Sequence, residues 1–196
     1  MKSVLLFLPK GFEAYEASVF TDIMGWSKFC GNEAVDLITT GLSYEIQCTW
    51  NFKIIPEIPF SKINVQDYDA LAIPGGFEKS GFYEDAFDAR LLNLIRQFDK
   101  EGKIIAAVCV AALSLGKSGI LANRYATTYD LDDEYGSRRK QLAAFGAIIK
   151  DEKIVVDKNI ITSTGPSTAP DVAFTLLEML TDKENVKIIK QFMRFD

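Results

Sequence analysis

The sequence predicts an α/β fold in which a mostly parallel central sheet is covered by helices on both faces. Short apolar runs, several of them β-branched, alternate with helix-length amphipathic segments, which is typical of consecutive β-α-β units. The length of 196 residues and the hydrophobic content of 48% allow one substantial core, and no repeat or low-complexity linker divides it. We therefore expect a flavodoxin-like three-layer sandwich, formed as a single domain by residues 1–196, that binds its ligand beyond the carboxyl ends of the strands.

Five apolar runs have the length and composition of strands. The first run ends before Pro9 and Lys10; it is too short for the apolar region of a signal peptide and lacks a small-residue cleavage site. The run KIIAAV has the β-branched character of a buried central strand. The segment EIQCTWNFKIIP alternates enough to add a strand or hairpin beside the main sheet. The expected strands are Ser3–Leu8, Ala34–Thr39, Asp69–Ile73, Lys103–Val108 and Asn159–Ser163.

Helix signals fill the intervals between these strands. In segment 85–101 the apolar residues fall three or four apart and form one stripe on an otherwise polar helix. The segment VAALSLGKSG is helix-forming and closes at Gly119, a residue type favoured just after a helix end. The expected helices are Glu13–Lys28, Asp85–Glu101, Val110–Ser118, Ala169–Thr181 and a terminal helix at Lys183–Phe195.

Charge and cysteine content narrow the classes of partner and the cellular compartment. The net charge of -5 comes from interspersed acids and bases, so no cationic stripe is available for nucleic acid or an anionic membrane. No apolar stretch approaches the roughly 20 residues that span a bilayer. Three widely separated cysteines, Cys30, Cys48 and Cys109, fit a reducing cytoplasm better than a disulfide framework, and they lack the C-x-x-C spacing of zinc sites.

The sequence contains no histidine. This absence excludes every Ser-His or Cys-His mechanism, and every histidine metal ligand, within this chain.

Cys109 lies where the predicted strand Lys103–Val108 gives way to a helix. A sharp turn at this point, a nucleophile elbow, exposes its central side chain above the sheet and needs small neighbours, which are here Ala107 and Ala111. The adjoining helix N-terminus would favour a thiolate and lower the pKa of the thiol. A buried core cysteine is the alternative, because free cysteine is among the most buried residue types. Spacing alone does not decide between the two.

Two further segments converge on the same edge of the sheet. The run ALAIPGGFE ends a strand in Gly75 and Gly76, whose missing side chains allow a close backbone approach. The N–H groups of Gly76 and Val110 would then form an oxyanion hole, although an ordinary strand-exit turn fits the same residues. Glu13 and Glu16 share the first turn of the first helix, where acids also complement the helix dipole. A carboxyl that reaches the thiol would have a raised pKa and act as a proton donor.

The segments PKGFEAYEAS, ALAIPGGFE, IIAAVCVAAL, YATTYD and IITSTGPSTAPDVAFTLLE together resemble the ThiJ/PfpI superfamily. This is a class I glutamine-amidotransferase-like group that includes the parkinsonism-associated deglycase, and the resemblance spans almost the whole chain in order. It implies that Cys109 is the nucleophile or oxidisable thiol, that Glu16 rather than Glu13 is the buried glutamate bonded to it, and that Gly76 and Val110 are the oxyanion donors. It also implies a homodimer.

The chain departs from the family pattern in two places. Many members have histidine after the Thr-Thr pair, where this chain has Tyr129 and then Asp130, so the Cys-His pair of the peptidase-like branch is missing. Tyr129 is a poor base near neutral pH, and Asp130 is either a base or a helix cap. The elbow continues as Val-Ala-Ala where glycine is common in the family, which narrows the pocket mouth.

The loop STGPST and the two tryptophans each allow two structural interpretations. The loop STGPST places Pro166 at the pocket, or else Ser167 or Thr168 caps the next helix. Trp26 and Trp50 are expected in the core, with the pocket or a dimer surface as the alternative. The candidate site residues are therefore Cys109 and Glu16 as catalytic groups, Gly76 and Val110 as oxyanion donors, and Gly75, Tyr129, Asp130 and Pro166 as pocket residues.

The leading hypothesis for function is a small-molecule enzyme in which Cys109 attacks a carbonyl and Glu16 moves the proton. The resemblance implies reactive carbonyls as substrates, in a glyoxalase-like or deglycase-like reaction or another hydration such as that of isonitriles. The rival hypothesis is an oxidative-stress responder that oxidises Cys109 without turnover. A peptidase or amidase ranks third because its base is absent, and a scaffold or chaperone-like dimer fourth. No cofactor is expected, since the sequence has no dinucleotide or phosphate-binding glycine motif and no metal-binding cluster.

Overall fold

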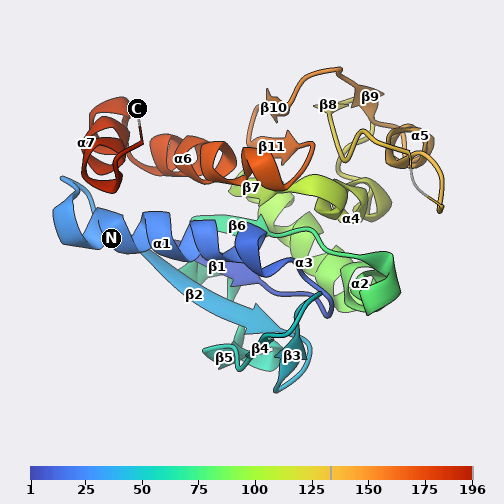
Figure 1. Cartoon of the computed structure of the whole chain (residues 1–196), viewed down its shortest axis with the longest axis horizontal. Coiled ribbons are helices and arrows are strands. Elements are labelled where there is room, and N and C mark those ends of the chain that lie inside the picture. Colours follow the sequence, from blue (N-terminus) through green and yellow to red (C-terminus); the bar gives the residue numbers. More distant parts are fainter. Residues whose placement is uncertain (133, 196) are drawn as a thin grey trace.

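A computed structural model describes residues 1–132 and 134–195 of the chain. Seven strands form one sheet with the spatial order β10-β11-β7-β6-β1-β2-β5 (Figure 1). All neighbouring pairs are parallel except β10 with β11, which are antiparallel. The strands are β1 (Lys2–Phe7), β2 (Val35–Gly41), β5 (Ile58–Pro59), β6 (Ala70–Ile73), β7 (Ile104–Ala107), β10 (Ile154–Asp157) and β11 (Ile160–Ser163). The flavodoxin-like fold and the five predicted strands are confirmed.

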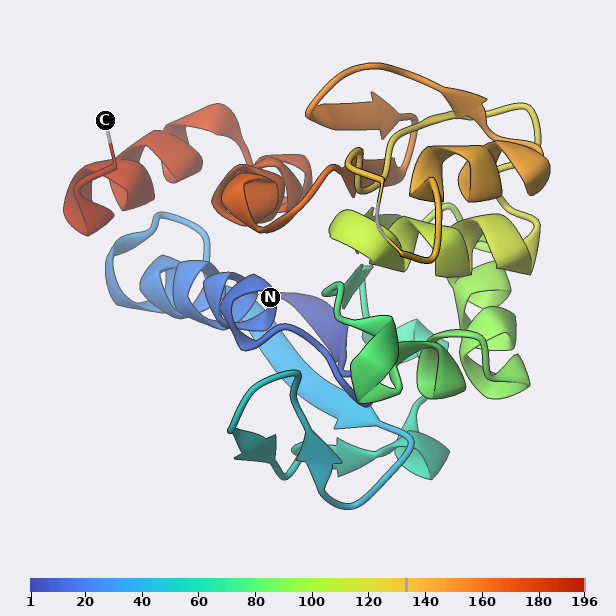
Figure 2. The same ribbon diagram turned by 45° about the vertical axis from the view of Figure 1, so that its right-hand side comes forward.

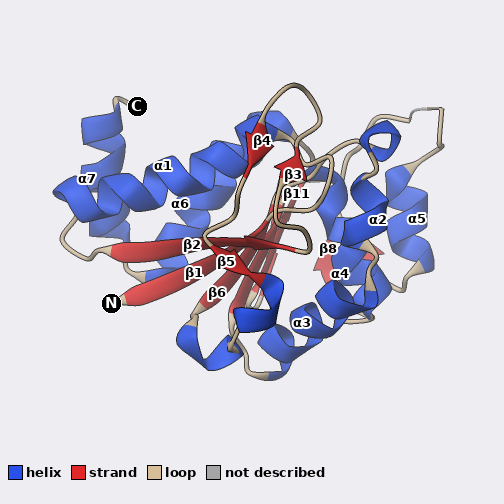
Figure 3. Cartoon of the chain, turned by 90° about the horizontal axis from the view of Figure 1, so that it is seen from below, coloured by secondary structure: helices blue, strands red, loops and turns tan. Residues whose placement is uncertain are grey.

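Helices cover both faces of this sheet, as Figure 3 shows with the sheet seen nearly edge-on. One face carries α1 (Ala14–Cys30), α6 (Ala169–Leu180) and α7 (Lys183–Met193), and the other carries α3 (Ala89–Lys100) and α4 (Ala112–Ser118). Although α1 and α7 lie at opposite ends of the sequence, they are side by side in Figures 1 and 2. The central strands β7 and β11 are almost entirely buried, and all of β6 is inaccessible to solvent.

The predicted helix Asp85–Glu101 is wrong at one point, because two helices occupy this region. The first, α2 (Phe82–Ala86), ends before Phe87. The second, α3, begins after Asp88, whose carboxylate accepts a hydrogen bond from the N–H of Arg90 at 2.8 Å. Such a side-chain cap satisfies a free helix N–H and so favours a new helix start at this residue.

Several short elements lie outside the predicted set. The segment around Cys48 forms a two-stranded antiparallel sheet, the hairpin alternative, from β3 (Ile46–Gln47) and β4 (Lys53–Ile54). A second small sheet pairs β8 (Tyr125–Ala126) with β9 (Ile148–Ile149) in parallel, and α5 (Arg138–Ala144) lies between them in sequence. The 3-10 helices of the described residues are Phe60–Lys62, Val65–Asp67, Glu78–Ser80, Cys109–Ala111 and Pro166–Thr168. None of the described helices has the length and apolar character to cross a bilayer.

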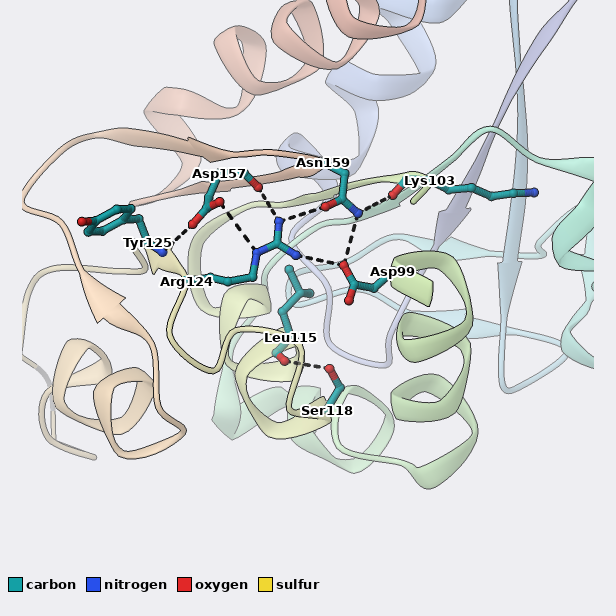
Figure 4. A network of polar contacts seen from close by, with 8 residues as sticks. All are labelled: Asp99, Lys103, Leu115, Ser118, Arg124, Tyr125, Asp157 and Asn159. Carbon is teal, nitrogen blue, oxygen red and sulfur yellow. Dashed lines mark hydrogen bonds and ion pairs between the residues drawn. The ribbon is translucent and has the colours of Figure 1, made fainter. Parts of the chain in front are cut away.

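A polar network centred on Arg124 ties together the amino ends of β7 and β11 (Figure 4). The guanidinium donates to Asp99 Oδ1 and to Asn159 Oδ1, both at 2.9 Å, and also to the carbonyl of Asp157. Asn159 in turn donates to the carbonyl of Lys103 at 2.9 Å, just before β7 begins. This network therefore fixes the end of the sheet opposite to the carboxyl ends of its parallel strands.

We expect Arg124→Ala to lower the free energy of unfolding by about 2–4 kcal/mol, because it leaves partly buried carboxylate and carbonyl groups without their donor. Urea denaturation followed by circular dichroism measures this change. Arg90→Ala is the matched control, since Arg90 is exposed and forms an ion pair with Asp88 at the surface, and it should change stability little. Equal effects of the two substitutions would contradict a structural role for the Arg124 network.

Candidate active site

Cys109 occupies a strained turn directly after β7. The N–H of Val108 donates to the carbonyl of Ile73 at 3.1 Å, so strand pairing continues up to the residue before the turn. Cys109 then adopts a φ of 58°, a left-handed conformation that is costly for a residue with a side chain. The small neighbours Ala107 and Ala111 are fully buried beside it. The chain therefore forms the elbow that the sequence predicts.

The carbonyl of Cys109 is held from a separate segment. The hydroxyl of Thr128 donates a hydrogen bond to it at 2.9 Å, and both residues are buried. This bond fixes the backbone of the elbow from the far side of the site, because Thr128 lies in the loop after β8. The Thr-Thr segment thus contributes through Thr128 to the position of the thiol.

Glu16 lies in the first turn of α1 and is completely buried beneath the elbow. Its Oε2 accepts a hydrogen bond from the N–H of Gly75 at 2.5 Å, and its carboxyl shares a side-chain hydrogen bond with Cys109. Its other oxygen, Oε1, has no hydrogen-bond partner among the described residues. The structure therefore brings the predicted Cys109 and Glu16 together.

Gly75 lies at the point where these groups meet. A Cβ at this position would be 2.7 Å from Glu16 Oε2 and 2.8 Å from the Cβ of Cys109. Both distances are shorter than any ordinary carbon contact, so only glycine leaves room for the pair. Gly75 forms the wall beneath the site and does not line the cavity itself.

Burial determines the protonation of the pair. Burial raises the pKa of Glu16 to about 8, the negative charge of Glu13 adds to this rise, and the Gly75 N–H opposes it. The carboxyl therefore keeps its proton at neutral pH. Burial also raises the pKa of the Cys109 thiol, an ionised Glu16 would raise it further, and the N–H of Val110 acts in the opposite direction. The lowered thiol pKa expected from the helix N-terminus alone is not what the structure supports, because desolvation is the larger effect.

The thiol faces a cavity of about 590 Å³. Cys109 is 6% exposed, and its side chain forms part of the cavity floor together with Gly76 and Val110. Segments 11–13 and 75–77 form a short antiparallel bridge. Its two hydrogen bonds run from the N–H of Phe77 to the carbonyl of Gly11 and from the N–H of Glu13 to the carbonyl of Gly75. The N–H of Gly76 takes part in neither of them. Gly76 and Val110, the predicted oxyanion donors, therefore line the same cavity as the thiol, and the N–H of Val110 is hydrogen-bonded to the sulfur.

Of the remaining predicted pocket residues, some line the cavity and one does not. Tyr129 and Pro166 line the cavity. Asp130 does not; its carboxylate lies 3.6 Å from Arg139 in an ion pair. Asp130 also caps no helix, since α5 is capped by Ser137. Thr168 donates to the carbonyl of Gly165 at 2.6 Å and makes no cap bond to α6.

The sequence analysis identifies little of the cavity wall. Trp50, for which the core is the first expectation and the pocket the alternative, is 62% exposed and lines the cavity beside Phe77, with ring centroids 5.4 Å apart. Trp26 by contrast packs partly buried against the core. Arg138 is 4% exposed, forms a 2.9 Å ion pair with Glu78 and lies over the ring of Tyr83 at 5.6 Å. No periodic or motif signal marks these residues.

No metal centre is evident in the described ranges. Residues 1–132 and 134–195 contain no group of three or more histidine, cysteine or acidic side chains arranged to hold a metal ion. The thiol of Cys109 lies at the cavity floor, and the carboxyl of Glu16 and the N–H of Val110 are hydrogen-bonded to it.

The sequence model of the DJ-1/PfpI family matches residues 2–179. The chain belongs to this family. It is 27% identical to protein dj-1beta of Drosophila melanogaster over 188 residues, which cover 95% of this chain and 93% of that protein. The crystal structure of the same Drosophila protein superposes with a TM-score of 0.86 at 26% identity and covers 100% of this chain and 98% of that one. The predicted ThiJ/PfpI resemblance is confirmed.

A second DJ-1 relative carries a name that describes an activity. The glutathione-independent glyoxalase DJR-1.2 of Caenorhabditis elegans is 27% identical over 185 residues, which cover 93% of this chain and 91% of that protein. This DJ-1/PfpI chain therefore aligns with a glyoxalase over nearly the whole length of both proteins.

The buried Glu16 makes stability depend on pH. Its pKa is about 8 in the folded protein and near the ordinary 4.5 when unfolded, so the folded state binds the extra proton between these values. Stability therefore falls as pH rises from about 4.5 to about 8, by up to on the order of 4 kcal/mol. Urea denaturation at several pH values should show this slope in the wild type and a flatter one in Glu16→Gln. Parallel slopes in the two proteins would contradict the raised pKa, because Glu13 and Asp85, whose pKa values burial also raises, are present in both.

Proposed function

We propose that this DJ-1/PfpI protein is a cysteine-dependent enzyme that converts small 2-oxoaldehydes into 2-hydroxy acids. One observation carries the proposal. The thiol of Cys109 lies at the floor of a cavity and is hydrogen-bonded to the carboxyl of Glu16, whose pKa is about 8. The similarity to a glutathione-independent glyoxalase supports this substrate class. A deglycase-like reaction would begin with the same attack on a carbonyl carbon.

The first step forms a bond between Sγ of Cys109 and the aldehyde carbon while the C=O π bond breaks. A protonated Glu16 carboxyl has both an acceptor oxygen and an O–H donor. It therefore accepts the thiol proton on one oxygen and delivers its own proton from the other, so that the product is a neutral hemithioacetal. The N–H groups of Gly76 and Val110 stabilise the negative charge that develops on the substrate oxygen.

The later steps need no external oxidant. Moving the hydrogen from the former aldehyde carbon to the neighbouring carbonyl carbon oxidises the first and reduces the second, which leaves a thioester on Cys109. Addition of one water breaks the S–C bond and releases the 2-hydroxy acid with the thiol restored. Glu16 is the titratable group that contacts the thiol, and it moves the protons in this scheme.

Cys109→Ala should abolish the conversion of methylglyoxal to lactate, and Glu16→Gln should lower kcat by about a hundredfold or more, because an amide cannot exchange the proton. Enzymatic assay of lactate measures both. Cys30→Ala is the control, since Cys30 lies at the end of α1, away from the cavity, and it should keep full activity. Turnover of the Cys109→Ala protein equal to wild type would overturn the proposal.

A redox role for the same thiol is the second candidate. It is favoured by the donors around the sulfur, since Val110 N–H and a protonated Glu16 can both donate to an oxidised sulfur. Two equivalents of hydrogen peroxide oxidise a thiol to sulfinic acid with release of two waters. We expect peptide mass spectrometry to show two added oxygens on Cys109 and none on the buried Cys48. Equal oxidation at both cysteines would contradict a selective role.

The oligomeric state of the chain and its cellular compartment remain predictions. We propose that the chain works as a single domain, forms a homodimer and acts in the cytoplasm, as expected from the sequence and the family. Light scattering of the purified chain tests the dimer, and a single species of monomer mass would overturn it.

A further inference from the structure

We propose that Glu13 makes this cavity selective for carbonyl compounds that carry a positive charge next to the aldehyde, in preference to neutral or anionic ones. The inference deepens the proposed function and rests on it, because it assumes that Cys109 adds to an aldehyde. It concerns a residue that the attack on the carbonyl does not itself require.

Glu13 is the uncompensated charge of the described cavity wall. Each cation in that wall already has a carboxylate partner: Arg138 pairs with Glu78 at 2.9 Å and Lys79 pairs with Glu134 at 2.5 Å. The carboxylate of Glu13 is half-buried and forms no hydrogen bond or ion pair within the described part of the chain. A cationic substrate would supply the missing partner, whereas an anionic one would be repelled.

Backbone hydrogen bonds bring two aromatic residues to the same cavity wall as Glu13. The N–H of Thr49 donates a hydrogen bond to the carbonyl of Phe12 at 2.7 Å. The N–H of Phe77 donates to the carbonyl of Gly11 at 3.2 Å, and the hydroxyl of Thr49 donates to the same carbonyl at 2.6 Å. Glu13, Trp50 and Phe77 therefore line the same cavity, and the rings of Trp50 and Phe77 contact each other with centroids 5.4 Å apart. Their rings are 62% and 44% exposed, so apolar aromatic surface is available to a ligand.

A binding site that combines aromatic rings with a carboxylate is suited to alkylammonium groups. The rings attract the cation through their quadrupoles and contact its methyl groups, while the carboxylate supplies the opposite charge. A cation bound beside the Glu13 carboxylate would favour its ionised form and so offset the burial that raises the pKa of Glu13.

Two nearly isosteric aldehydes test the proposal. Betaine aldehyde carries a trimethylammonium group, and 3,3-dimethylbutanal has a neutral tert-butyl group in its place. Each is added to the full chain over a range of concentrations, and protection of Cys109 from iodoacetamide is read by peptide mass spectrometry with Cys30 as internal reference. In the adduct the Sγ–C bond forms, the C=O π bond breaks and the thiol proton ends on the new hydroxyl.

We expect betaine aldehyde to protect Cys109 at a concentration about tenfold lower than the neutral aldehyde does. Glu13→Gln should abolish this preference, and Glu13→Asp, which keeps the charge, should retain most of it. Glu152→Gln is the control for net charge, since Glu152 is exposed and outside the cavity wall, and it should leave the preference unchanged. Thermal melts followed by circular dichroism confirm that each variant is folded.

The outcomes separate the two proposals. Protection by neither aldehyde would overturn the carbonyl chemistry and the selectivity with it. Equal protection by both aldehydes in the wild type, or a preference that persists in Glu13→Gln, would overturn the role of Glu13 and leave the proposed function intact.

Discussion

The missing side chain at Gly75 lets three segments meet at one point. A Cβ there would crowd the carboxyl of Glu16, the Cβ of Cys109 and the carbonyl of Val108, which lies 3.0 Å away. At Gly76 a Cβ would be only 2.2 Å from the carbonyl of Gly11. The end of β6 can therefore touch both the elbow and the start of α1. This contact determines how deeply Glu16 is buried, and depth of burial in turn determines the pKa of its carboxyl.

Two glutamates at the start of one helix differ in depth of burial. Glu13 precedes the first residue of α1 at the cavity wall and is half-buried, whereas Glu16, in the first turn, is completely buried. Burial raises the pKa of both residues, and the deeper Glu16, with a pKa of about 8, keeps its proton at neutral pH where the thiol lies. Dipole complementation alone would not distinguish the two residues, since both acids lie near the same helix N-terminus.

The sequence is sufficient to predict the five parallel strands and the elbow, because a buried strand requires a continuous apolar run and the elbow requires small neighbours around Cys109. The break at Asp88 was missed because apolar periodicity continues across a short interruption, whereas the cap is a single side-chain contact. The exposure of Trp50 depends on bonds from Thr49 to Gly11 and Phe12, which join segments far apart in sequence. Arg138 reaches Glu78 across 60 positions. Local sequence patterns do not reveal contacts between residues so far apart in the chain. The residues of the cavity wall are therefore less predictable from the sequence than those of its floor.

The raised pKa of Glu16 bears on the absence of histidine from the chain. Histidine serves as the usual acid and base near neutral pH because its unperturbed pKa is about 6.5. A carboxyl at its ordinary 4.5 cannot hold a proton there, but burial and the Glu13 charge move Glu16 to about 8. A group with this pKa could give and take a proton close to physiological pH, which is the property that a histidine would otherwise contribute. In the proposed function, burial therefore supplies the acid and base through Glu16, and Tyr129, at the position where many family members have histidine, would not need to perform that role.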